Sequence, residues 1–191
     1  TNLPFEILEG ESVVIISNSY HVGNETETDF LQCINKSLIK KQKTFNVIPT
    51  QQFINQLYPW FEPRTAPQTT DDLSSFLARD LVREKIETLD VKYFINISGQ
   101  TKTNASSGAL TCAAGPGGGG CFGLAWWDDT SSYSASIWDL SEEASVGNVS
   151  ASVSGTSVIP ALVIPIPILA RTQKTACEEL ADQILDFFSR N

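Results

Sequence analysis

Apolar residues follow two different spacings along the chain, and the change falls near Gly99. Before it, three short runs rich in β-branched residues predict buried strands at 12–20, 44–48 and 91–98. Apolar positions three and four residues apart predict helices between these strands, at 28–41, 50–58 and 71–89, the last of which can divide into two.

After Gly99 the helical spacing disappears, and serine, threonine, glycine and aromatic residues dominate until near the carboxyl end. Three short strands are predicted in this part of the chain, at 124–127, 133–140 and 146–154. In the last of them valine and alanine alternate strictly with serine, which is typical of a strand with one buried face. A final helix is predicted over 172–188, where apolar residues return to the helical spacing.

These elements follow the order β-α-β-α-α-β-β-β-β-α in a single domain that spans residues 1–191. The pattern predicts an α+β fold, a mixed β-sheet with its helices packed on one face. The first and last helices would then lie side by side on that face, which brings Cys33 close to Cys177. These two cysteines can form a bridge between the helices or remain as two buried thiols.

A second pair of cysteines, Cys112 and Cys121, flanks a glycine-rich loop at 112–121. A disulfide here would close a flexible segment and stabilise the fold by roughly 2–3 kcal/mol in the chain-entropy model. A metal site is not expected, because the sequence contains one histidine and no C-x-x-C pair. Disulfides imply an oxidising compartment, so the chain is expected to be exported, periplasmic or outer-membrane-associated, with an extracellular location as the alternative.

The charge balance excludes two classes of partner. Lys and Arg total 13 against 22 Asp and Glu, a formal net charge of -9, which disfavours nucleic acid and anionic membrane surfaces. The longest apolar run, at 158–170, contains three prolines and is shorter than the roughly 18 residues of a membrane-spanning helix. Membrane attachment is therefore expected only through a lipid anchor, which these residues do not include. The absence of Met and the start at Thr1 indicate a processed or trimmed chain.

The sequence contains no recognisable catalytic arrangement, and the chain is expected to be neither an enzyme nor dependent on a cofactor. His21 is the only histidine, so any nucleophile–histidine pair would have to use it. Neighbouring acids occur at three places with the chemistry of helix caps or turns: Asp71/Asp72, Asp128/Asp129 and Glu142/Glu143. A hydrolase that uses His21 or one of these pairs is the last of three hypotheses for the function.

Two segments favour a contact surface. Four aromatic residues fall close together on a predicted hairpin: Trp126, Trp127, Tyr133 and Trp138. Alternation places Trp126 and Trp127 on opposite faces of one strand, so one of them is expected at a surface, an interface or a groove. The proline-rich segment 158–170 is expected to be an extended apolar contact segment, with contact residues Ile159, Leu162, Ile164, Ile166 and Leu169. For both segments the alternative is burial inside the monomer.

Four stretches carry a resemblance to a known group of domains: SVVIISNSY, TFNVIPTQQF, VKYFINISGQTKT and SASIWDLSEEASVGNVSASVSGTS. The pattern resembles the small periplasmic α/β domain shared by the curli-secretion channel lipoprotein, the amino-terminal domain of the TolB translocation protein and several outer-membrane lipoproteins. Some of those lipoproteins activate peptidoglycan synthases or assist polysaccharide export, so the resemblance implies a role in the cell envelope. The GPGGGG loop and the VIPALVIPIPILA segment depart from the general pattern.

Pattern and resemblance together predict an exported accessory or assembly protein that acts by protein–protein contact, for example as a ring or filament subunit. Its partner is expected to be another protein or a second copy of itself. The first alternative is a carbohydrate-binding module that uses the same tryptophans to stack on sugars. The second alternative is the hydrolase described above.

Overall fold

The computed structural model describes residues 7, 9–17, 26–42, 44–60, 70–142, 144–164 and 168–189. Within these ranges five strands form one mixed sheet, and five helices accompany it. Of the candidate site residues proposed above, His21, Glu143 and Ile166 lie outside the described ranges.

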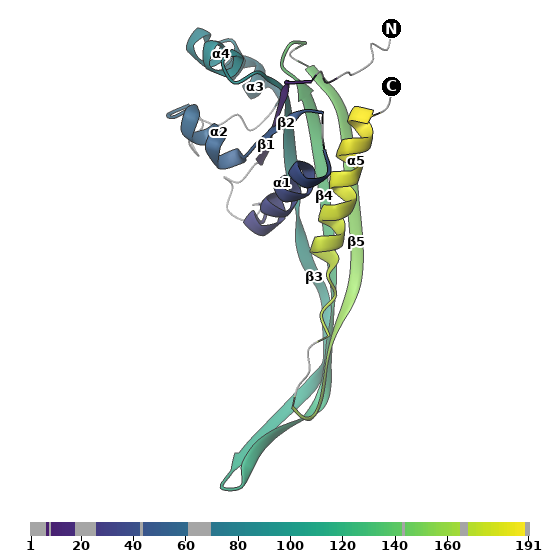
Figure 1. Ribbon diagram of the computed structural model, residues 1–191. Coiled ribbons are helices and arrows are strands. Elements are labelled where there is room, and N and C mark those ends of the chain that lie inside the picture. Colours follow the sequence, from purple (N-terminus) through teal and green to yellow (C-terminus); the bar gives the residue numbers. More distant parts are fainter. Residues whose placement is uncertain are drawn as a thin grey trace.

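The sheet has the strand order β2-β1-β3-β4-β5 (Figure 1). Its parallel half consists of β1 (Ser12–Ser17), β2 (Asn46–Ile48) and the first part of β3 (Val91–Gly115). Its antiparallel half consists of β3, β4 (Gly118–Asp139) and β5 (Ala144–Val163). The mixed sheet and the order of elements are confirmed, except that the strands expected at 124–127 and 133–140 are one strand, β4.

Helices cover both faces of the sheet, so the prediction that they all pack on one face is wrong. Two of them, α1 (Thr28–Lys41) and α5 (Thr172–Ser189), enclose a core on the first face. The opposite core lies beneath α2 (Thr50–Gln56), α3 (Thr70–Leu77) and α4 (Asp80–Glu87).

The residues of β1 explain this arrangement. Val13 and Ile15 point into the core beneath α1 and α5, whereas Val14 and Ile16 point into the core beneath α2, α3 and α4. A strand that is buried on both faces has consecutive apolar residues instead of alternating ones, and the run VVII has that pattern.

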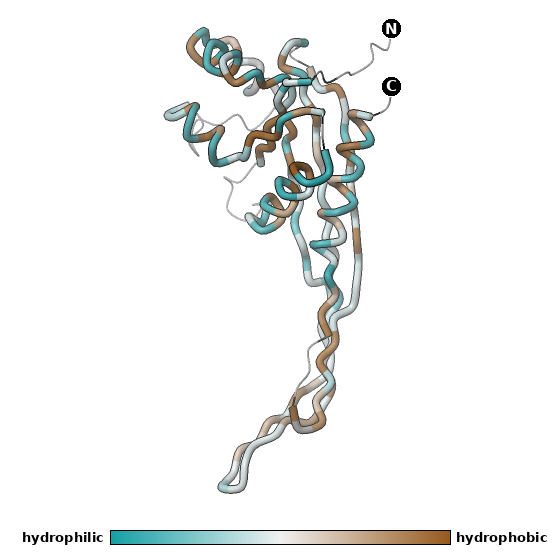
Figure 2. The backbone as a smooth tube through the Cα atoms, in the orientation of Figure 1, coloured by the Kyte–Doolittle hydropathy of each residue, from teal (hydrophilic) through white to brown (hydrophobic). Residues whose placement is uncertain are grey.

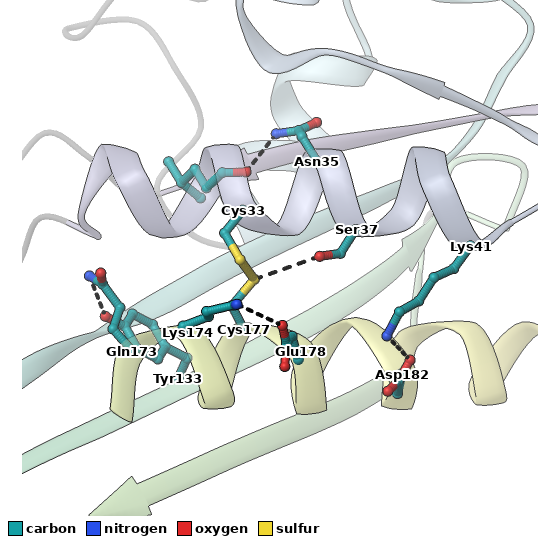
Figure 3. The surroundings of a disulfide bond; sticks show 11 residues. Cys33, Asn35, Ser37, Lys41, Tyr133, Gln173, Lys174, Cys177, Glu178 and Asp182 are labelled. Atoms are coloured by element: carbon teal, nitrogen blue, oxygen red, sulfur yellow. Dashed lines mark hydrogen bonds and ion pairs between the residues drawn. A yellow bond between two sulfur atoms is a disulfide. The ribbon is translucent and has the colours of Figure 1, made fainter. Parts of the chain in front are cut away.

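A disulfide between Cys33 and Cys177 joins α1 to α5, so the bridge that the sequence left open is present (Figure 3). Nearby, the Lys41 ammonium donates to a carboxylate oxygen of Asp182 at 2.6 Å and links the same two helices. The bridge connects residues that are 144 positions apart in the sequence, and it therefore ties the first helix to the last.

Beyond the helices, the antiparallel strands continue as a narrow projection that we call the arm (Figure 1). It comprises 103–127 from β3 and β4, 156–164 from the end of β5, and 168–170, where the chain has reversed and Ile168 pairs with Val158. The glycine-rich loop expected at 112–121 is the tip of the arm. Paired strands run up to Gly115 and resume at Gly118, and the predicted Cys112–Cys121 disulfide joins directly opposite residues.

Candidate functional site

The arm differs from the rest of the molecule in charge. No charged side chain occurs in 103–127 or in 144–170, so all 13 basic and 22 acidic residues of the chain lie elsewhere. Figure 2 shows the hydrophilic colour concentrated on the helices, with white and brown along the arm. An uncharged surface can be removed from water without the large desolvation penalty of ionised groups, which favours a contact role.

One face of the arm is apolar and open to solvent. Phe122, Leu124 and Trp126 alternate along β4 on this face, and their side chains are 72%, 46% and 39% exposed. The neighbouring strand adds Leu162, which is 78% exposed and lies directly opposite Phe122. We call these four residues, with Val158 and Pro160 between them, the apolar arm face. Exposed large apolar side chains gathered on one surface are typical of an interaction site.

Trp127 lies on the opposite face of β4, as the alternation predicts. Its indole N–H donates to the Asp129 carboxylate at 3.0 Å, and Thr103 Oγ1 donates to the other oxygen of that carboxylate at 2.7 Å. This face is partly covered, because the backbone N–H of Ala170 donates to Ser157 Oγ at 3.0 Å and Ala161 is buried. Trp126 is therefore the tryptophan of the pair that is most open to a partner.

Two aromatic residues proposed from the sequence as contact residues are core residues instead. Tyr133 is 2% exposed and Trp138 is 7% exposed, one in each of the two cores, so neither is available to a partner. The reason is that the part of β4 nearest its carboxyl end lies between helices on both faces. In the proline-rich segment, Leu162, Ile164 and Leu169 are exposed as expected, whereas Ile159 is half-buried.

A hydrogen-bonded cluster fixes the arm where it leaves the helices. Tyr133 donates to Glu27 Oε2 at 2.7 Å, while the backbone N–H of Thr101 donates to Glu27 Oε1, also at 2.7 Å. Hydroxyl contacts continue the cluster from Thr101 Oγ1 to Ser131 Oγ at 2.8 Å, and from there to Thr172 at the start of α5. Sequence reasoning missed this cluster, since its residues lie far apart and follow no spacing rule.

Burial raises the pKa of Tyr133 to about 12, from an ordinary value of 10.0. The folded protein therefore holds the phenol proton more tightly than the unfolded chain does, and its stability declines as the pH rises from 10 to 12. At neutral pH, Tyr133→Phe removes the bond to Glu27 and should lower the free energy of unfolding by about 1.5–3 kcal/mol.

This stability difference between the wild type and Tyr133→Phe should shrink between pH 10 and pH 12, because only the wild type loses a proton at this position. Urea unfolding of both proteins across that range measures it. Tyr93, whose pKa burial also raises, is unchanged in the variant and contributes equally to both curves. A constant difference across the range would contradict the assignment.

The outer edge of β3 is a second open surface of the arm. Near the helices and the two cores, which we call the body, this edge is capped, because Ile97 O accepts from Thr26 Oγ1 at 3.4 Å and the Thr101 N–H donates to Glu27. Farther out, at 102–115, no strand of the described ranges pairs with this side of β3. In an antiparallel ladder every second residue directs its N–H and C=O away from its partner strand, so this edge has donors and acceptors that no strand of the described residues uses.

Of the acids proposed as catalytic pairs, Asp128 and Asp129 accept hydrogen bonds from neighbouring side chains of the sheet. Asp128 accepts from Thr156 Oγ1 at 2.6 Å, Asp129 accepts from Trp127, and both Asp72 and Glu142 are exposed. A shallow hollow beside Asp129, lined also by Arg171 and Lys174, contains no histidine or cysteine. Within the described ranges, no three His, Cys, Asp or Glu side chains gather as a metal site would require. None of the described helices is both long and apolar enough to cross a membrane.

No family model and no curated protein matches the chain. Two solved structures are similar over most of its length. A PelC dodecamer from Paraburkholderia phytofirmans is 11% identical, with 97% of this chain and 93% of that chain covered and a TM-score of 0.42. A neuraminyllactose-binding hemagglutinin homolog from Helicobacter pylori is 8% identical, with 97% and 87% covered and a TM-score of 0.40. Likenesses of this size do not establish a shared function.

Proposed function

We propose that this chain is an exported accessory or assembly protein of the cell envelope, and that it acts by protein–protein contact through its arm. The observation that carries the proposal is the apolar arm face, where Phe122 and Leu162 are both more than two-thirds exposed on an uncharged projection. A surface of this kind is stabilised when a partner covers it. The proposal makes the protein a binding component without a catalytic role.

Two disulfides support the exported location, because such bonds persist in oxidising compartments. Within that location we propose the periplasm or the outer membrane, in line with the sequence resemblance to envelope lipoproteins.

The open edge of β3 supports a role as a ring or filament subunit. Natural proteins protect exposed strand edges with charges, prolines or bulges. Here the register shifts between Thr103 and Ala105, and from there to Gly115 the edge has neither a charge nor a proline. Its side chains are mostly small, with Ala and Ser predominant, so another chain can approach the backbone closely.

A matched pair of double variants tests the proposal. In extracts of the source envelope, the wild-type chain should migrate in a complex larger than the monomer, and Phe122→Lys with Leu124→Lys should migrate as the monomer. Burying two ammonium groups at an apolar contact is prohibitive, whereas on an exposed surface each substitution changes the stability by less than about 0.5 kcal/mol. Size-exclusion chromatography followed by immunodetection provides the measurement.

Leu81→Lys with Ile39→Lys is the control, since Leu81 and Ile39 are exposed apolar residues of helices outside the arm. This variant should keep the complex. A monomeric wild type, or a complex that survives in the Phe122→Lys/Leu124→Lys variant, would exclude contact through the arm.

Carbohydrate binding is the second candidate, and one observation favours it. The exposed indole of Trp126 stands one row from Asp128 and two rows from Thr130, whose hydroxyl accepts from Asn104 Nδ2 at 2.6 Å. An aromatic face beside carboxylate and amide oxygens can stack on a sugar and bond its hydroxyls. Retention of the wild type but not of Trp126→Ala on an immobilised neutral polysaccharide, with no protein complex in the envelope extract, would favour this candidate.

A further inference from the structure

We propose that the apolar arm face is covered by the same face of a second copy of this chain, in a two-fold pair whose arms point in the same direction. The inference rests on the proposed function of the arm as a protein-contact surface, and it adds the identity of the partner and the geometry of the contact. Three observations carry it: the sizes of the side chains on the face, the distribution of charge, and the open edge of β3.

Side chains on this face are arranged by size, in three columns. Strand pairing places Thr111, Phe122 and Leu162 in one row, followed by Ala109, Leu124 and Pro160 in the next. The third row contains Ser107, Trp126 and Val158, and Ile168, which pairs with Val158, adds an exposed apolar residue at the far side of β5. The column from β3 is therefore small in every row, whereas the columns from β4 and β5 are large.

This asymmetry selects one orientation for a second copy. Two sheets that pack face to face lie about 10 Å apart, and their side chains interdigitate between them. A two-fold axis parallel to the strands places β3 of each copy over β5 of the other, so that Thr111 faces Leu162 and Ala109 faces Pro160 of the second copy. Arms that ran in opposite directions would place small side chains on small ones, and the resulting voids lose packing energy.

The distribution of charge permits this pair. Neither arm has a charged side chain in 103–127 or 144–170, so no ionised group is removed from water at the contact. Parallel arms bring the two bodies to the same end, and each chain has a formal net charge of -9. The bodies then repel each other through solvent, and added salt should strengthen the pair by screening that repulsion.

The open edge of β3 disfavours a lipid surface as the alternative cover. Its unused backbone groups at 102–115 would have no hydrogen-bond partner in hydrocarbon, which costs several kcal/mol for each group. Between two protein sheets the same edge remains at the rim of the contact, where water satisfies it. A second copy therefore covers the apolar side chains without burying the edge.

Cross-linking through single introduced thiols tests the pair in the purified protein. The four native cysteines are all in disulfides, so Leu124→Cys introduces the only thiol, and two of them would face each other across the two-fold axis. Leu110→Cys is the control, because Leu110 is also exposed but belongs to the opposite face of the same arm. A short bis-maleimide should join Leu124→Cys chains at least about tenfold faster than Leu110→Cys chains.

A second variant distinguishes shape complementarity between the two faces from non-specific hydrophobic binding. Ala109→Trp adds apolar surface but fills the small column, so it should weaken self-association by at least about tenfold. Sedimentation equilibrium measures this, and the wild-type dimer should tighten as salt is raised. A surface that merely binds apolar material would instead gain affinity from the new indole.

Three results would overturn the inference. The first is a wild type that stays monomeric at about 100 μM in high salt. The second is equal cross-linking of the two thiols. The third is a Leu124→Cys thiol that phosphatidylethanolamine/phosphatidylglycerol vesicles protect from maleimide, whereas a higher protein concentration does not. The last result would assign the face to lipid. None of the three removes the complex expected in envelope extracts, so the inference and the proposed function can fail separately.

Discussion

Replacing both Cys33 and Cys177 by serine should lower the free energy of unfolding by about 4–5 kcal/mol. The bridge closes a loop of 144 residues, and the denatured chain gains the corresponding entropy when the bridge is absent. For a domain of this size the melting temperature should fall by roughly 10–20 °C. Urea unfolding followed by circular dichroism measures the loss, with the purified variant kept under the same conditions as the wild type.

The other disulfide provides the matched control. Cys112 and Cys121 are nine positions apart at the tip of the arm, where neither core reaches, so that part of the arm can open without unfolding the body. Replacing both by serine should therefore lower the stability of the body by less than half as much. Equal losses in the two double variants would show that the body and the tip unfold as one unit.

Much of the body could be predicted from the sequence because its signals are local. The helices at both ends were predicted within a few residues, and the stripes on which Cys33 and Cys177 lie predicted that the two would meet. The prediction that all helices pack on one face was wrong, although the run VVII at 13–16 indicates helices on both faces. Four consecutive apolar residues in a strand require cover on both faces, and that information is local as well.

The arm could not be predicted in the same way. Residues 103–115 have no apolar run and include small residues and glycines, which have low strand propensity. They form a strand because β4 pairs with them residue by residue, and pairing across a hairpin is not visible in either strand alone. The two cysteines that face each other near the tip were the one local sign of that register.

The predictions for the contact residues succeeded where they depended on local strand geometry and failed where they depended on tertiary packing. Alternation correctly separated Trp126 from Trp127, because it depends only on the strand geometry. It could not reveal that Tyr133 and Trp138, farther along the same strand, lie where helices cover both faces. The hydrogen bonds of Glu27 could not be predicted from the sequence either, because they depend on the positions of Tyr133 and Thr101 in the folded protein.

That junction joins the uncharged arm to the rest of the molecule through hydrogen bonds and a ring contact. Beyond it, the described helices give the strands no cover, and the arm continues the β3–β4–β5 ladder, with the contacts at its base adding to the strand pairing. Tyr133 stacks on Phe30 with ring centroids 3.4 Å apart, and its hydroxyl reaches Glu27 on the same side. A change that displaces Tyr133 should therefore affect both the stability of the body and the position of the arm.

Gly99→Ala should make such a change and lower the free energy of unfolding by about 3–5 kcal/mol. Gly99 lies opposite Tyr133 in the β3–β4 ladder and has a φ of +138°, a conformation that side-chain-bearing residues rarely adopt. A Cβ there would come within 2.2 Å of Ser132 O and 2.6 Å of the Tyr133 Cα, so the backbone of β4 must move.

Two measurements separate this effect from a general loss of stability. Urea unfolding gives the change in free energy, and tyrosine ionisation monitored by absorbance should show one residue that titrates closer to its ordinary pKa of 10.0. Gly117→Ala is the matched control: it lies in the turn at the tip of the arm, with open space around an added Cβ, and should change the stability by less than about 0.5 kcal/mol. Equal effects of the two substitutions would mean that the close approach of Gly99 to β4 does not contribute to the stability of the fold at Tyr133.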